Sequence, residues 1–202
     1  TSSSAGDATA LPNVAPASAA PAAIDGDSAT SWVSNALQAA VGQWLQVDFD
    51  HPVTNATLTL TPAVSTLGAQ VNRLEIATAN GTATLLVDQP GRPVAVALPY
   101  GETPWVRITA TGTENGSSGV QFGITDLAVT QFDASGYAHP VNLRHTAVVP
   151  PPPLGAPVAM WDLGSDTPGR GGCVSARDGV HCASPLSLAP EELVNMSRTL
   201  MV

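Results

Sequence analysis

Lysine is absent from this sequence of 202 residues, and its seven basic residues are all arginines. Charged residues make up only 11% of the chain, and the formal net charge is −9. The arginines are scattered from Arg73 to Arg198, whereas neutralising phosphate groups requires clustered positive charge. The composition therefore argues against nucleic acid and against an anionic membrane surface as partners.

Long apolar runs are also missing. No stretch approaches the roughly 20 residues that a transmembrane helix needs, and no basic segment followed by an apolar stretch indicates a signal peptide. The last residues, from Asn195 to Val202, have the pattern of a strand that is cut short. We therefore expect an excised part of a longer protein that does not itself insert into a membrane.

Catalytic motifs are absent as well. The sequence has no Gly-x-Ser-x-Gly elbow, no His-Glu-x-x-His pair and no glycine-rich phosphate loop. Its four histidines are dispersed. The acidic pair Glu191-Glu192 follows a proline, which is typical of the first turn of a helix. The sequence thus predicts a chain without catalytic activity of its own.

The chain has only two cysteines, Cys173 and Cys182, in the segment GCVSARDGVHC. The glycines and Arg-Asp-Gly between them suit a turn that brings both ends together. A disulfide there would contribute about 2–3 kcal/mol and would imply an oxidising, extracytoplasmic compartment. The alternative is a metal site with His181, but two cysteines and one adjacent histidine make a poor zinc set.

Alternation of apolar and polar residues with a period of two predicts several short strands. Turn signals such as Asn80-Gly81 and Asn115-Gly116 separate them, which favours an antiparallel all-β sandwich. The expected strands are centred on residues 45–49, 58–60, 74–76, 94–98, 106–108 and 127–129.

Composition divides the chain into three parts. Residues 1–21 are small and polar, so we expect a flexible or extended arm. Residues 22–132 contain the strand patterns. Residues 133–202 include a polyproline run and few strand signals, which predicts a Pro-rich linker and an irregular, disulfide-tied strap.

Residues 22–49 combine the acidic loop Asp25-Gly26-Asp27, a threonine and a tryptophan at short fixed offsets, and the run GQWLQVDF. This opening resembles that of discoidin-like, galactose-binding-like domains, which include coagulation-factor type C domains and many carbohydrate-binding modules. The resemblance covers about residues 22–132 and implies a jelly-roll-like β-sandwich. Since this fold usually binds rather than catalyses, it also implies a non-enzyme.

The same resemblance implies a structural calcium ion between the first loop and the last strand. Hard oxygen donors of the kind found there suit Ca²⁺. The alternative is a capped polar turn, in which side chains bond backbone amides without a metal. The residues that would supply oxygens are Ala22, Asp25, Asp27, Thr30, Thr125 and Asp126.

Ligands in the resembled family bind on loops at one end of the sandwich, which correspond here to residues 34–42, 62–70 and 111–123. These loops contain no tryptophan or tyrosine, in contrast to sugar-binding relatives. The candidate ligand-binding residues, on or beside these loops or on a nearby strand, are Gln38, Asn72, Arg107, Glu114, Asn115 and Gln121.

The tryptophans are expected to belong to the core more than to a ligand site. The expectation is strongest for Trp32 and weaker for Trp44. Trp105 lies on an expected core strand. Arg107 could contact a ligand, although pairing with a nearby carboxylate is the commoner arrangement for a strand arginine.

A second resemblance is carried by residues 160–164 (MWDLG), 169–173 (GRGGC), Cys182, Pro190-Glu-Glu and Arg198-Thr-Leu. This pattern is similar to the large mycobacterial arabinofuranosyltransferases of the D type. Those are polytopic membrane enzymes that build cell-wall arabinan and carry carbohydrate-binding-like modules on the periplasmic side. The resemblance implies a non-catalytic, extracytoplasmic module that holds arabinan or arabinogalactan-type glycan near a distant active site. The alternative is a structural spacer that packs neighbouring modules and binds no glycan.

Overall fold

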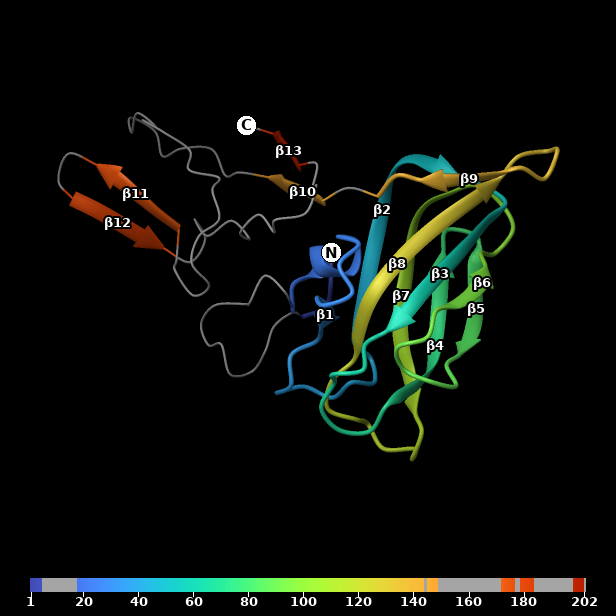
Figure 1. Ribbon diagram of the computed structural model, residues 1–202, viewed down its shortest axis with the longest axis horizontal. Coiled ribbons are helices and arrows are strands. Elements are labelled where there is room, and N and C mark those ends of the chain that lie inside the picture. Colours follow the sequence, from blue (N-terminus) through green and yellow to red (C-terminus); the bar gives the residue numbers. More distant parts are fainter. Residues whose placement is uncertain (5–17, 144, 149–171, 177–178, 184–197, 202) are drawn as a thin grey trace.

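A computed structural model describes residues 1–4, 18–143, 145–148, 172–176, 179–183 and 198–201 of the chain (Figure 1). For the strands after residue 144, only the backbone is described. No helix within these ranges is both long and apolar enough to cross a bilayer. Most of the segments that carry the second resemblance lie outside the described residues.

Two antiparallel sheets pack into a sandwich, which confirms the all-β prediction (Figure 1). One sheet has the strand order β2 (Trp44–Val53), β7 (Thr103–Thr113), β4 (Val71–Thr78) and β5 (Gly81–Leu86). The other has the order β1 (Trp32–Val33), β8 (Gly123–Phe132), β3 (Ala56–Pro62) and β6 (Val94–Ala97). In the second sheet β9 (Ala138–Val141) also pairs with β8, so the sandwich extends beyond Phe132, where the sequence placed its end.

The core lies between the two sheets and is built by the alternating strand residues. Trp32 is fully buried, as the sequence predicts, and its ring packs edge-on against Phe122 with ring centroids 5.3 Å apart. The other fully buried large side chains on strands come from β3, β4, β7 and β8: Leu58, Leu60, Leu74, Ile76, Val106, Ile108, Ile124 and Val129.

The N-terminal residues belong to this sandwich. Residues 1–3 lie along β2, where the Gln46 amide donates to the Thr1 carbonyl (2.8 Å) and the Ser3 amide donates to the Trp44 carbonyl (2.9 Å). The short 3-10 helix η2 (Ala20–Ala23) buries Ala22 and Ala23. The expected arm is therefore, where it is described, paired with the edge of a sheet and packed on the core.

Four short strands occur in the C-terminal part, where the sequence predicted few. β10 (His145–Val148) pairs in parallel with β13 (Arg198–Met201), and β11 (Gly172–Ala176) pairs antiparallel with β12 (Gly179–Ala183). Strands of four or five residues are too short to produce a clear period-2 pattern. In the β11–β12 hairpin Cys173 lies directly opposite Cys182, which is the register that a cross-strand disulfide needs.

Candidate functional site

The acidic loop is held by hydrogen bonds among its own residues. The carboxylate of Asp25 accepts the amide of Asp27 (2.9 Å) on one oxygen and the hydroxyl of Thr30 (2.6 Å) on the other. The carbonyl of Asp27 accepts both the amide (3.2 Å) and the hydroxyl (3.1 Å) of Thr30. Gly26 between the two aspartates has a φ of +75°, which favours glycine. The loop thus gathers carboxylate, carbonyl and hydroxyl oxygens at one point.

This loop is tied to β8 next to the predicted metal site. The hydroxyls of Ser31 and Thr125 lie 2.8 Å apart, which brings the two chain segments of the expected calcium site together. Asp126 is exposed, and within the described ranges no three His, Cys, Asp or Glu side chains gather into a metal-sized group. The oxygen chemistry of the loop fits Ca²⁺, while Asp126 does not join Asp25 and Asp27 as a third clustered carboxylate. The bonds to Asp25 equally form the capped turn of the alternative interpretation, so calcium stays a prediction.

The three loops named as ligand-binding candidates do converge at one end of the sandwich, the lower end in Figure 1. The Val41 amide donates to the Ser118 carbonyl (2.9 Å), and the Glu114 amide donates to the Gln70 carbonyl (3.0 Å). The Leu67 amide donates to the side-chain oxygen of Gln121 (3.1 Å). These contacts link all three loops directly.

Most of the candidate polar side chains at this end bind the loops themselves. Gln121 is 4% exposed, and its side-chain nitrogen donates to the Ser34 carbonyl (3.1 Å). Gln38 accepts a hydrogen bond from Gln43 (2.9 Å). The Asn115 side-chain oxygen accepts the Ser117 amide (3.0 Å) and the Thr113 hydroxyl (3.2 Å). Large apolar side chains exposed on the loops are aliphatic: Leu37, Val64, Leu67 and Val120.

A different cluster stands on the outer face of the β2–β7–β4–β5 sheet. The guanidinium carbon of Arg107 lies 4.4 Å from the ring centroid of Trp44 and 6.0 Å from that of Trp105. Its Nε donates to the side-chain oxygen of Gln46 (2.9 Å), and the Gln46 nitrogen donates in turn to Asp48 (2.7 Å). We call these five residues the Trp–Arg cluster.

The cluster differs from what the sequence predicts for its members. Trp44 and Trp105 are half-buried on the outer face and not part of the core, because they occupy strand positions that alternate with the buried Leu45 and Val106. Arg107 pairs with an amide and two rings instead of a carboxylate; among the described side chains no acidic group lies within ion-pair distance of it. A strand pattern shows which residues share a face, but a cross-strand register is needed to bring β2 and β7 side chains together.

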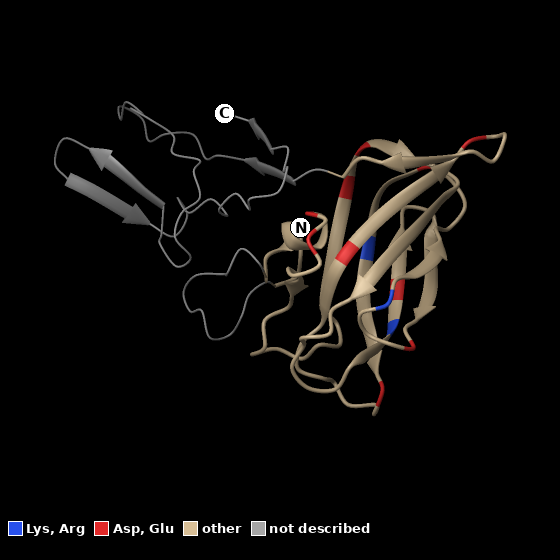
Figure 2. Cartoon of the chain, viewed as in Figure 1, with Lys and Arg blue, Asp and Glu red and all other residues tan. Residues whose placement is uncertain are grey.

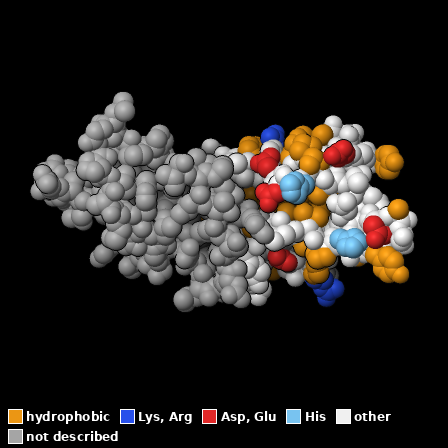
Figure 3. Space-filling view, turned by 90° about the horizontal axis from the view of Figure 1, so that it is seen from above, with side chains coloured by type: hydrophobic (Ala, Val, Ile, Leu, Met, Phe, Trp, Pro, Cys, Tyr) orange, Lys and Arg blue, Asp and Glu red, His pale blue; other side chains and the backbone are white. Residues whose placement is uncertain are grey.

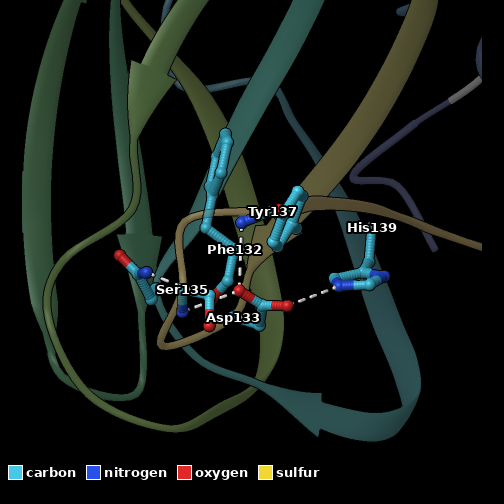
Figure 4. Close-up of polar contacts among 6 residues, drawn as sticks. Phe132, Asp133, Ser135, Tyr137 and His139 are labelled. Atoms are coloured by element: carbon cyan, nitrogen blue, oxygen red, sulfur yellow. Dashed lines mark hydrogen bonds and ion pairs between the residues drawn. The ribbon is translucent and has the colours of Figure 1, made fainter.

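The opposite end of the sandwich carries a polar turn (Figure 4). Between β8 and β9, the carboxylate of Asp133 accepts the amides of Ser135 (2.8 Å) and Tyr137 (3.0 Å) and lies 3.1 Å from His139 Nε2. The hydrogen bond with His139, followed by those of the two amides, lowers the pKa of Asp133 below its usual range.

An open pocket of about 460 Å³ adjoins this turn and is lined by residues that include Asp50, His51 and His139. Figure 3 shows two histidine side chains on this end, each beside acidic side chains. Charged residues are otherwise sparse over the sandwich (Figure 2). Of the residues that line the pocket, His139 also bonds to Asp133 of the turn.

The sequence matches the F5/8 type C domain family over residues 1–122. It is also 67% identical over 201 residues to an alpha-(1->3)-arabinofuranosyltransferase of Mycobacterium tuberculosis and 66% identical to the protein of the same name from Mycolicibacterium smegmatis. All of this chain is covered in both matches, and it spans 14% of the length of each relative.

The similarities to solved structures agree with these sequence matches. The chain is similar to the cryo-EM structure of arabinofuranosyltransferase AftD from mycobacteria, with a TM-score of 0.74 and 55% identity over 100% of this chain and 16% of that one. A CBM32 module of Clostridium perfringens, solved in complex with GalNAc-β-1,3-galactose, has a TM-score of 0.51 at 17% identity over 64% of this chain and 91% of its own. The second similarity concerns the fold alone.

Proposed function

This chain belongs to the F5/8 type C domain family, and we propose that it acts as a non-catalytic carbohydrate-binding module of a larger membrane arabinofuranosyltransferase. The observation that carries the proposal is the match of the whole chain to a 14% segment of proteins named arabinofuranosyltransferases. The segment is a discoidin-like module and not a catalytic domain, so glycosyl transfer belongs to other parts of such a protein.

The module would hold arabinan or arabinogalactan-type glycan close to the distant active site. Single carbohydrate-binding modules need only weak affinity for this task, because tethering to the enzyme gives the bound glycan a high effective concentration. This role places the module on the extracytoplasmic side of the membrane, where the polysaccharide is built, and its other partners would be neighbouring modules of the same parent chain.

A structural spacer that binds no glycan is the second candidate. It is favoured by the loop end, where Gln38, Asn115 and Gln121 are engaged in hydrogen bonds within the loops and no aromatic side chain is available to stack on a sugar.

Titration of the 202-residue chain with arabinan oligosaccharides separates the two functions. Saturable binding that a glucan oligosaccharide of equal length does not reproduce would support the binding module. Absence of binding at millimolar concentrations of arabinan oligosaccharide would support the structural spacer.

We also propose that the acidic loop holds a structural calcium ion. Asp25, Asp27 and Thr30, which already contact one another, would provide oxygens, joined by the carbonyls of Ala22 and Thr125. Asp126 would have to approach the loop as the ion binds. Calcium would fix the loop against β8 and take no part in chemistry.

The disulfide between Cys173 and Cys182 belongs to the same proposal. The opposed positions of the two residues in β11 and β12 support it, since both kinds of antiparallel cross-strand pair have Cα separations of about 4.5–5.5 Å, within the disulfide range. Its presence would agree with the extracytoplasmic side of the membrane.

A further inference from the structure

The outer face of the β2–β7–β4–β5 sheet carries both half-exposed tryptophans of the sandwich, whereas the loop end has none. We propose that the Trp–Arg cluster on this face (Trp44, Gln46, Asp48, Trp105 and Arg107) is the surface that binds glycan. The inference rests on the proposed function and assigns its site to a sheet face, away from the three loops.

Arg107 is fixed in place with most of its hydrogen-bonding capacity unused. A guanidinium has five N–H donors, and only the Nε–H of Arg107 has a hydrogen-bond partner among the described residues. The contact with the Trp44 ring, with the guanidinium carbon 4.4 Å from the ring centroid, and the bond to Gln46 hold the group on the sheet. The terminal N–H groups are therefore presented by a positioned side chain, which lowers the entropy cost of binding.

The chemistry around Arg107 fits a neutral ligand rich in hydroxyl groups. Asp48 lies on β2 directly opposite Trp105, two positions from Gln46, which pairs with Arg107, so an acceptor of hydrogen bonds lies on the same sheet face as the donors of Arg107. A sugar hydroxyl can donate a hydrogen bond to the Asp48 carboxylate and accept one from the Arg107 guanidinium. A polyanion would meet Asp48, the exposed Glu75 on the neighbouring β4 and a chain of net charge −9, which disfavours acidic ligands.

The two indoles set the length of the ligand. Trp44 lies opposite Thr109, four positions along β7 from Trp105, which offsets their backbones by about 13 Å along the strand direction. The two rings lean toward each other, with the guanidinium carbon of Arg107 between them at 4.4 Å and 6.0 Å from their centroids. The ring of Trp105 is half-exposed, and indole surfaces pack well against apolar C–H groups. A ligand that touches both rings must extend over more than one sugar residue, so the face should prefer oligosaccharides to monosaccharides.

Packing against another protein module is the competing use of this face. Tryptophan and arginine are common in protein interfaces, but acidic residues are depleted there, and this face carries Asp48 and Glu75. The outward positions around the cluster are mostly polar (Arg73, Glu75, Thr82, Thr84, Thr109 and Thr111), with Ala77 and Leu86 as apolar exceptions. A polar sheet face with a narrow aromatic strip matches a glycan chain better than a neighbouring module.

The test measures binding of an arabinan oligosaccharide to the 202-residue chain and to four single variants. Trp105→Ala and Arg107→Ala each remove one part of the cluster. Tyr100→Ala is the matched control, because Tyr100 is 93% exposed and lies outside the cluster, and Glu114→Ala probes the loop end. Thermal melting of each variant establishes that it is folded.

We expect Trp105→Ala and Arg107→Ala to raise the Kd about tenfold or more, equivalent to about 1.4 kcal/mol each, and the other two variants to change it less than twofold. If Glu114→Ala weakens binding and the cluster variants do not, the inference is overturned and the proposed function stands. If the unmodified chain does not bind at all, both are overturned. If the cluster variants do not fold, NMR spectra of the unmodified chain provide the test. On titration with arabinan, the indole N–H signals of Trp44 and Trp105 should shift, whereas that of the buried Trp32 should not. Unchanged Trp44 and Trp105 signals would contradict the inference.

Discussion

The indole N–H of Trp32 donates a 3.1 Å hydrogen bond to the backbone carbonyl of Ser4. Trp32 is completely buried, so this bond attaches the N-terminal residues to the centre of the sandwich. Ser4 also accepts the Asn35 amide on its hydroxyl (3.0 Å). Ser4 thereby joins the N-terminal segment to two other parts of the chain, the tryptophan that follows the acidic loop and the first candidate loop.

Replacing Trp32 with phenylalanine should lower the free energy of unfolding by about 1–3 kcal/mol. The substitution leaves a cavity and a carbonyl without its donor. Chemical denaturation of the two proteins measures the difference. Tyr100→Phe, at a 93% exposed position, is the aromatic control and should be close to neutral. Equal stability of Trp32→Phe and the unmodified chain would contradict the role given to this bond.

Gln121→Glu should destabilise the loop end by about 3 kcal/mol at pH 7. The buried side-chain nitrogen donates to the Ser34 carbonyl, and a carboxylate there would be a buried charge facing another acceptor. The cost should shrink as the pH falls and the new carboxyl becomes protonated. Urea unfolding at pH 7 and pH 4, with the exposed Gln89→Glu as control, tests both statements. A pH-independent difference between the two variants would count against them.

Calcium should raise the melting temperature if the acidic loop binds it. A ligand present at 100 times its Kd adds about 2.7 kcal/mol to the stability of the state that binds it. Differential scanning fluorimetry with Ca²⁺ and with EDTA measures the shift, and Asp25→Asn should abolish it whereas the exposed Asp88→Asn should not. A melting temperature that is the same in both buffers would favour the capped turn.

Cys173 and Cys182 should be joined in protein prepared without reductant. Intact mass spectrometry then gives a mass lower by two hydrogens than after reduction, and the β11–β12 peptide remains linked on digestion. Reduction should remove about 2–3 kcal/mol of local stability. Two thiols that react with an alkylating agent before reduction would remove the support for an extracytoplasmic location.

Titration of Asp133 should show a pKa below the usual range for aspartate, chiefly because of the hydrogen bond with His139. A group whose pKa is lowered on folding contributes stability above its unfolded pKa, and this contribution is lost as the pH falls through the folded pKa. NMR titration of the Asp133 carboxyl should show a higher pKa in His139→Ala. Tyr137→Ala, which keeps its backbone amide, should leave the pKa near that of the unmodified chain; an unchanged value in His139→Ala would contradict the assignment.

The amino-acid sequence by itself determined the fold class and six strands of the sandwich, β2, β3, β4, β6, β7 and β8. It did not predict β5 (Gly81–Leu86), an edge strand with one buried residue. Alternation places Leu58 and Leu60 or Leu74 and Ile76 on one face of a strand, because side chains point to opposite faces at successive residues. The acidic loop and the tryptophan after it indicated the discoidin-like family, whose match covers residues 1–122. Short strands such as β1, β9 and β11 are too brief for such a pattern, and the N-terminal residues lacked large side chains that would reveal their packing.

Only the tertiary structure decided which polar side chains are available to a ligand. Gln121 looks like a surface residue in the sequence, yet the convergence of three loops buries it and satisfies its amide. Trp44 and Arg107 are 63 residues apart in the numbering, and they meet because the register of β2 with β7 places them on adjacent strands of one face. Periodicity is a local property of the chain, whereas register and loop convergence depend on contacts between distant segments, so neither can be read from one strand alone.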